Sequence, residues 1–406
     1  MNMSLFLSVI LSFVLFYNPP IVSINTIVLG GLISFIYNFF NFKKIINNKK
    51  IIDVIVMQFL YTIIFVYLFI IIVLNSQSIN NLAFIIYIIL FVFSICVSIS
   101  IIFIKNKLDI KQVLNIFLIT GSIQGFISIV SLLFPNIQSL IIERIVSLGY
   151  SSVWLKITDH RLFGYSDSLT FSMPIVQSFL AIVSFYMYLR FDRKYILFTP
   201  LLVLSAIINA RTSIVIIVIG FLLIIFEFKN VFKNNFLKSI FSLFLITGIF
   251  YVVSILLSRI FPEIYQWAAE GLELIFRFLK GDNSEGYFSY ITDPKVYRLP
   301  EDIIGKLFGR GHRIMEISSI NSDVGFINDT WLGGFIYVVI IYTITMNLLI
   351  NIKKNINEFL SSFIVKFLVL TLFVSNFKGT IIGLNGIYSL IILLFIYSKL
   401  SSDTSH

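Results

Sequence analysis

The residues of this chain that could do chemistry are a few cations and one histidine. A guanidinium matches the oxygens of phosphate or pyrophosphate bidentately, and histidine accepts a proton near neutral pH. We expect the anion-binding residues to be Arg161, Arg211, Arg310 and Lys378, and the catalytic residues to be His312 as base and Asp323. Asp323 could orient the histidine or bind sugar hydroxyls. The set suits transfer of a group from a lipid pyrophosphate to a hydroxyl, with the cations stabilising the leaving anion.

Each of these residues also has a non-catalytic interpretation. A polar surface loop contains such residues anyway, so His312 could be a solvated loop histidine. Arg211 and Lys378 could extend to the phosphates of surrounding lipids, as long cationic side chains near a membrane surface do. Residue types alone therefore leave catalysis and ordinary surface polarity both open.

The elements that position these residues are apolar. The chain has 406 residues, of which 58% are hydrophobic and 12% are charged, and its mean hydropathy is +0.98. Soluble domains carry about 25% charged residues, so the composition excludes an ordinary soluble fold and predicts an all-α, polytopic membrane protein. The net charge of +10 lies in short hinges between apolar runs rather than in one patch. That distribution sets membrane topology and argues against a nucleic-acid partner.

Apolar runs of spanning length predict about twelve transmembrane helices, at 3–17, 21–40, 51–74, 82–104, 113–134, 169–189, 195–209, 212–228, 239–260, 331–350, 359–376 and 380–398. Lysines and arginines fill alternate hinges, whereas the hinges 18–20 and 75–81 contain none. By the positive-inside rule, both termini are expected in the cytoplasm of a bacterial cell. We expect a single integral membrane domain over residues 1–406.

One long extracytoplasmic loop is expected between spans nine and ten, at residues 262–330. Its first part, 263–280, has the apolar spacing of an amphipathic helix, and a second short helix is expected from Pro300 to Gly309. Arg211 lies in a tight turn between two spans of about fifteen residues, each only about 23 Å long against a hydrocarbon core of about 30 Å. We therefore expect Arg211 to lie below the outer surface, where a charge is a functional candidate.

No cofactor or metal site is expected from the sequence. The outward histidines are His160 and His312, and the chain has neither an HExxH pattern nor a GxxxxGK phosphate-binding loop. A single cysteine, Cys96, provides neither a disulfide nor a cysteine-based metal site.

Three short segments late in the chain carry a resemblance: Ile304–His312, with the run Phe-Gly-Arg-Gly-His, then Asn321–Ile327, with Ser-Asp-Val-Gly-Phe, and then Gly333–Tyr337. Together they resemble the Wzy-type polysaccharide polymerases, bacterial membrane proteins that polymerise capsular or O-antigen repeat units. Arg161–Gly164 and Ala210–Ser213 are similar to that family and to the related O-antigen ligases.

The resemblance implies a glycan transfer at the outer face of the cytoplasmic membrane. The substrate would be an oligosaccharide on undecaprenyl pyrophosphate, and a chain-length regulator and a flippase would be candidate partners. Arg161 and Arg211 would bind pyrophosphate, His312 would be the base, and Asp323 would bind or orient the acceptor. The downstream spacing of the ligase histidine motif is not matched in this sequence.

Two alternatives stay open: an O-antigen-ligase-type transferase and a lipid-linked oligosaccharide flippase. Flippases keep short hinges and place charges within the helix bundle, whereas this chain places them in outer loops, which favours the enzyme. An ion-coupled symporter would show inverted repeats or broken helices, and the sequence shows no such symmetry.

Overall fold

A computed structural model describes most residues of the chain. These are residues 3–21, 25–41, 50–147, 163–227, 248, 251, 255, 258–280, 293–314, 322–356, 358–380, 383 and 385–401. Arg161 and most of the expected span at 239–260 lie outside them.

The regular secondary structure of the described residues is entirely helical. Five helical stretches are long and apolar enough to cross a membrane: α4 (Ile51–Leu74), the run Ile79–Lys105, α7 (Ile110–Leu133), α9 (Ser172–Arg190) and α17 (Gly325–Asn355). A helix satisfies its own backbone hydrogen bonds, which a lipid environment requires. The chain therefore has the secondary structure of a membrane-embedded, all-helical protein.

Shorter helices accompany these five along the chain. The apolar ones are α1 (Met3–Tyr17), α2 (Thr26–Phe40), α10 (Phe198–Ile207), α11 (Thr212–Glu227), α18 (Glu358–Asn376) and α19 (Gly386–Ser401). The run Ile79–Lys105 is made of the 3-10 turn η1 (Ile79–Leu82), α5 (Ala83–Tyr87), the π-helical turn η2 (Ile88–Val92) and α6 (Phe93–Lys105). The connection after α7 contains the helix α8 (Pro135–Ser147), which was not predicted from the sequence.

The polar stretch that begins at Pro262 contains the two expected helices. They are α14 (Pro262–Leu279) and α16 (Ile303–Phe308), and the 3-10 turn η5 (Pro294–Tyr297) lies between them. The polar stretch was expected to end at Thr330, before the next helix. In the structure that helix, α17, already begins at Gly325. Val324 has extended backbone angles at this start.

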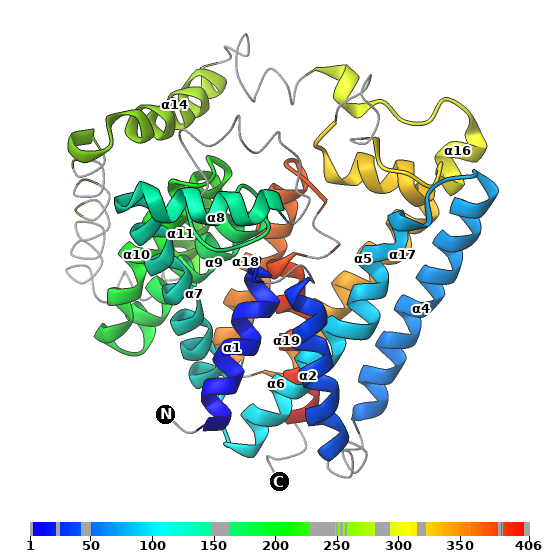
Figure 1. The fold of residues 1–406 in the computed structure, drawn as a ribbon, viewed down its shortest axis with the longest axis horizontal. Coiled ribbons are helices and arrows are strands. Elements are labelled where there is room, and N and C mark those ends of the chain that lie inside the picture. The colour runs from blue at the N-terminus through cyan, green and yellow to red at the C-terminus, as the bar shows by residue number, and fades with distance from the viewer. Residues whose placement is uncertain are drawn as a thin grey trace. The chain divides into compact units, whose positions relative to one another are not determined.

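The helices form two compact units. Unit 1 comprises residues Met1–Phe117, Tyr290–Val365 and Leu372–His406. Its centre is α19, which is buried along nearly its whole length and packs on α6, α17, α1 and α4 (Figure 1). A helix that is apolar all round is expected in such a central place. Tyr388 of α19 and Tyr61 of α4 share a hydrogen bond of 2.5 Å between their buried hydroxyl oxygens.

Unit 2 comprises residues Leu118–Ser289 and Lys366–Thr371. Its centre is α9, buried from Ser172 to Met187 and packed between α10 and α11. The ring of Phe179 in α9 is stacked on that of Phe367 in α18, with centroids 5.3 Å apart and planes at 10°. Lys366 forms an ion pair with Glu227 at the end of α11.

Candidate functional site

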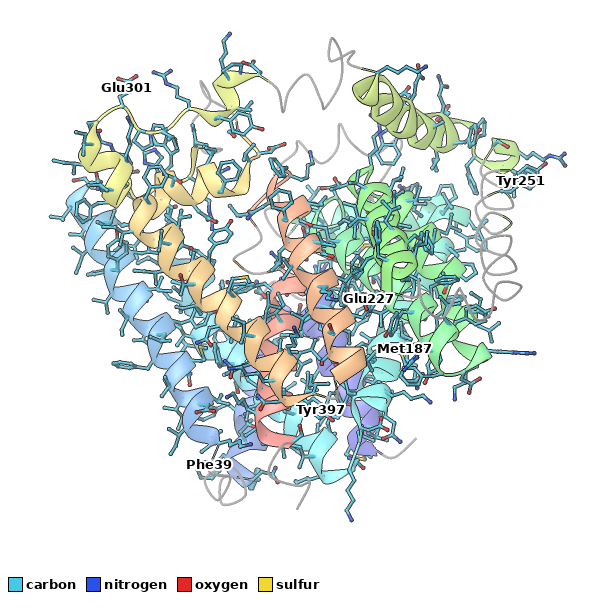
Figure 2. The ribbon with its side chains drawn as sticks, turned by 180° about the vertical axis from the view of Figure 1, so that it is seen from behind. Phe39, Met187, Glu227, Tyr251, Glu301 and Tyr397 are labelled. Carbon is cyan, nitrogen blue, oxygen red and sulfur yellow. The ribbon has the colours of Figure 1, made fainter. Side chains whose placement is uncertain are left out.

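The polar residues of unit 1 gather around α16 and the start of α17. Figure 2 shows Glu301, just before α16, at one end of this unit and Phe39 of α2 toward the other. Asp302 begins α16 by accepting a hydrogen bond of 2.9 Å from the backbone N–H of Gly305. Gly309 ends the helix with φ of 81°, a conformation that favours glycine. The sequence signals for both ends of this helix are therefore correct.

Asp302 also pairs with Arg310, the first of the expected anion-binding residues. The backbone N–H of Gly305 holds the pKa of Asp302 below its usual range, and the Arg310 guanidinium acts in the same direction. Arg310 therefore has a carboxylate partner, and an incoming anion would have to compete with it.

The helix α17 is interrupted at Gly334, whose φ of 72° and ψ of −178° are not helical. An interruption removes the hydrogen bonds that the preceding carbonyls would accept within a continuous helix. Three carbonyls before the break have partners elsewhere: Trp331 O accepts from Arg310 N at 2.6 Å, Leu332 O from Gly311 N at 3.0 Å, and Gly333 O from Tyr67 Oη at 2.8 Å. The break in α17 therefore creates the acceptors that hold the loop after α16.

Glycines make this docking possible on both sides. A Cβ atom at Gly309 would lie 2.6 Å from the backbone nitrogens of Gly333 and Gly334, and one at Gly334 would overlap the backbone of Leu307. Asn81, in the turn η1 after α4, fixes the same loop by donating to Gly311 O at 2.8 Å. The segments Ile304–His312 and Gly333–Tyr337 thus form one tightly packed body (Figure 1).

The third segment of the resemblance, which contains Ser322 and Asp323, belongs to the same unit. Ser322 Oγ donates to Val296 O at 2.7 Å, which fixes the segment to the turn η5. Asp323 forms an ion pair of 3.4 Å with Lys378. The structure thus brings together a residue expected to be catalytic and a residue expected to bind an anion. Among the described side chains, no hydrogen bond or ion pair joins Asp323 to His312.

His312 is half-buried at the end of the docked loop. Its Nδ1 lies 3.2 Å from Arg310 O, and its ring lies 5.6 Å from that of Trp331 at an interplanar angle of 46°. The other ring nitrogen, Nε2, is buried and has no hydrogen-bond partner within the described part of the chain. If Nδ1 carries the proton, which it can donate to Arg310 O, Nε2 is left as the acceptor.

Two further residues of unit 1, Arg313 and Asp329, were not among the expected site residues. Asp329 is 0% exposed, and among the aspartate, glutamate, lysine, arginine and histidine residues that the structure describes it is the one that is fully buried. Its two carboxylate oxygens and the Nε and Nη2 atoms of Arg313 are buried without hydrogen-bond partners there. Asp329 stands directly before the apolar run of α17, where an ionisable residue is a functional candidate by default, and this signal could have identified it.

Arg211 belongs to unit 2, between α10 and α11. Its Nε donates to Trp267 O at 3.0 Å, and its Nη2 pairs with Glu270 at 2.6 Å. The guanidinium carbon lies 5.0 Å from the Trp267 ring centroid, a cation–π contact. Trp267 and Glu270 are in α14, the expected amphipathic helix, so Arg211 connects the turn to that helix.

The turn before Arg211 also fixes the chain next to Arg161. The side chain of Asn209 accepts from Phe163 N at 2.9 Å and donates to Phe163 O at 2.8 Å. Phe163 follows Arg161 by two residues. The chain is therefore anchored at Phe163 to Asn209, which lies two residues before Arg211. The expected roles of the two arginines remain predictions.

The described site has cations with carboxylate partners, aromatic side chains and one histidine nitrogen without a partner. No group of three or more His, Cys, Asp or Glu residues is gathered as for a metal ion in the described ranges. Together these features define an all-helical, membrane-embedded protein with a polar cluster at one end of unit 1. No protein-family model, no curated protein and no solved structure matches the chain.

Proposed function

We propose that this protein polymerises lipid-linked oligosaccharide repeat units into a capsular or O-antigen polysaccharide. In this proposal the chain crosses the bacterial cytoplasmic membrane about twelve times, with both termini in the cytoplasm and residues 262–330 outside. The growing glycan leaves undecaprenyl pyrophosphate and is joined to a hydroxyl of the next lipid-linked unit. The reaction is a glycosyl transfer and needs no cofactor.

The observation that supports this function is that the three resembling segments belong to one unit, in which two of them pack directly on each other. They are separated in the sequence, yet Gly309 packs on Gly333 and Gly334, and Ser322 is anchored to η5. A chance likeness in loop composition would not require glycines at both surfaces of a backbone-to-backbone contact. Two of the segments that carry the resemblance, Ile304–His312 and Gly333–Tyr337, therefore act structurally as one element.

The cations suit a pyrophosphate leaving group. Arg310 and Lys378 in unit 1 and Arg211 in unit 2 each have a carboxylate partner, and their side chains are 40%, 32% and 31% exposed. Such partly exposed ion pairs are worth little in free energy, about 0–1 kcal/mol, so an anion with more charge can displace the carboxylate. Arg161, by resemblance, would assist them.

In the proposed reaction His312 Nε2 accepts the proton of the acceptor hydroxyl. The oxygen forms a bond to the anomeric carbon of the donor sugar, and the bond from that carbon to the pyrophosphate breaks. The bonding electrons leave with the pyrophosphate, whose charge the cations stabilise. Asp323 would bind or orient the acceptor.

The test uses the purified full chain with its undecaprenyl-pyrophosphate-linked oligosaccharide, separating products by glycan length. Arg211→Ala is expected to abolish long-chain glycan while the protein still inserts into the membrane, because removing an anion-stabilising group costs about 100-fold or more in rate. Lys295→Ala, which removes an exposed lysine of the polar stretch after Pro262, is the control for loss of a positive charge and should make normal glycan. Normal long-chain glycan in Arg211→Ala would refute the assignment.

His312 has a separate test, because a base and a binding residue differ in what they preserve. His312→Ala should lose turnover but keep binding of the lipid-linked donor. Equal loss of both would make His312 a binding residue. A cysteine introduced as Ser284→Cys should react with an impermeant thiol reagent added outside the cell, and labelling only from the cytoplasmic side would contradict the topology.

The same preparation separates the alternatives. Transfer of the glycan to an acceptor other than another repeat unit would indicate a ligase. Movement of the lipid-linked donor across vesicle membranes without any glycan transfer would indicate a flippase.

A further inference from the structure

The fully buried Asp329 and the half-buried Arg313, whose Nε and Nη2 atoms are buried, present complementary groups that do not bind each other. The Asp329 carboxylate interacts electrostatically with the Arg313 guanidinium, but no direct hydrogen bond or ion pair joins them, and both carry buried polar atoms without partners in the described part of unit 1. A carboxylate needs a donor and a guanidinium needs an acceptor. Leaving either unsatisfied away from water costs free energy.

The neighbouring side chains give this pair a defined environment. The Arg313 guanidinium carbon lies 4.8 Å from the centroid of the Phe84 ring. The Tyr337 hydroxyl is fully buried, has no partner among the described atoms, and interacts electrostatically with both Arg313 and Asp329. Asn376 donates to the hydroxyl of Tyr342, which also interacts electrostatically with Asp329. Several unsatisfied polar atoms thus lie around one carboxylate.

The charges of the two side chains restrict which chemical group could bind to both of them. A phosphate-like anion would be repelled by an ionised Asp329, and a metal cation would be repelled by Arg313. A hydroxyl group is neutral, accepts a hydrogen bond from a guanidinium and donates one to a carboxylate. A hydroxyl therefore satisfies both sides with a single oxygen.

We propose that Arg313 and Asp329 form a binding site for a sugar hydroxyl, with Arg313 donating to its oxygen and Asp329 accepting its proton. If the proposed function holds, on which this identification rests, the hydroxyl is that of the glycan acceptor. Asp329 is then a second candidate for the base, beside His312. With Asp329 as the base in place of His312, the acceptor O–H bond breaks and its proton passes to the Asp329 carboxylate. The freed oxygen forms the bond to the anomeric carbon, and the carbon–oxygen bond to pyrophosphate breaks with its electron pair leaving on pyrophosphate.

Occupancy of the site can be measured without turnover. An apolar carbodiimide modifies carboxylic acids that are shielded from water, so the purified full chain should be modified at Asp329 faster than at the partly exposed Asp323, as read by peptide mass spectrometry. Methyl glycosides of glucose and of N-acetylglucosamine are the probes, with permethylated glucose and inorganic pyrophosphate as controls. A bound glycoside at about ten times its dissociation constant should slow modification about tenfold.

The expected result is slowing by at least one free-hydroxyl glycoside, none by permethylated glucose or pyrophosphate, and loss of the protection in Arg313→Gln. If neither glycoside slows the modification of Asp329, the site holds water only. If pyrophosphate slows it, the site binds anions. Each of these results alone overturns the proposal. The double variant Asp329→Asn with Arg313→Gln removes both charges together. It should remain folded and bind neither glycoside in a direct calorimetric titration, and glycoside binding equal to that of the unmodified protein would also overturn the proposal.

A turnover assay separates this inference from the proposed function. Asp329→Asn should lose glycan transfer while still binding the lipid-linked donor. If the unmodified protein makes polymer and Asp329→Asn makes it equally well, the inference fails and the proposed function stands. If glycosides protect Asp329 but the unmodified protein transfers no glycan, the hydroxyl site stands and the polymerase function fails.

Discussion

Gly334→Ala adds a single methyl group and should weaken the contact between α17 and the loop that follows α16. Its φ of 72° and ψ of −178° belong to a region that only glycine adopts readily, and forcing another residue into such a region costs about 1–3 kcal/mol. A Cβ there would also overlap the backbone of Leu307 and Phe308, and such overpacking costs about 1–3 kcal/mol more. Even the smaller values sum to about 2 kcal/mol.

The loss should appear where α16 and its following loop are held on α17. The backbone N–H groups of Arg310 and Gly311 donate to carbonyls just before Gly334. If Gly334→Ala weakens this contact by about 2 kcal/mol, hydrogen exchange at those two amides should be about 30-fold faster. Exchange in α19, which is buried in the centre of unit 1, should change much less.

Gly383→Ala is the matched control for this measurement. A Cβ at Gly383 would meet nothing within 4 Å, and its φ lies outside the left-handed region. Exchange at Arg310 and Gly311 should therefore be unchanged in this variant. If Gly334→Ala and Gly383→Ala gave the same exchange rates at both amides, the account of the docked loop would be refuted.

Two further predictions concern the cap of α16 and the core of unit 2. Because the fold lowers the pKa of Asp302, its stabilising effect on α16 should be complete above the unfolded value of about 4 and be lost as pH falls through the folded value. The protection of the Gly305 amide from hydrogen exchange, relative to the intrinsic rate at each pH, checks this, and the pH dependence of that protection should vanish in Asp302→Asn. Phe179→Ala removes a buried ring stacked on Phe367 and should cost about 3–5 kcal/mol in detergent unfolding, whereas Phe226→Ala, at a ring that is 73% exposed, should cost less than about 0.5 kcal/mol. Equal losses in the two phenylalanine variants would contradict the assigned core.

Much of the helical framework could be predicted from local patterns. The predicted boundaries of α1 and α4 agree with the structure, and both expected helices of the polar stretch are present as α14 and α16. These elements depend on runs of apolar residues and on capping residues that are adjacent in the sequence. The start of α17 was placed about six residues too late because its first turns are polar, and α8 was missed for a similar reason.

The candidate site was predictable only in part. The sequence identified Arg310, His312, Asp323 and Lys378 as candidates, and the structure places these four in unit 1. It also pairs Lys378 with Asp323, although the two had been given separate roles. Residue type and hydropathy give no information about which carboxylate will lie beside which cation, since these partners are tens of residues apart.

The sequence by itself determined that this chain is built of apolar helices, because hydropathy and helix capping are properties of neighbouring residues. Only the tertiary structure decided which polar atoms are left without partners. Asp329 and Arg313 look like ordinary charged residues of a polar stretch, and in the fold of unit 1 both have buried polar atoms without hydrogen-bond partners among the described residues. The break at Gly334 and the docking of the loop after α16 are likewise long-range contacts. The physical reason is that burial and hydrogen-bond satisfaction depend on contacts between distant segments.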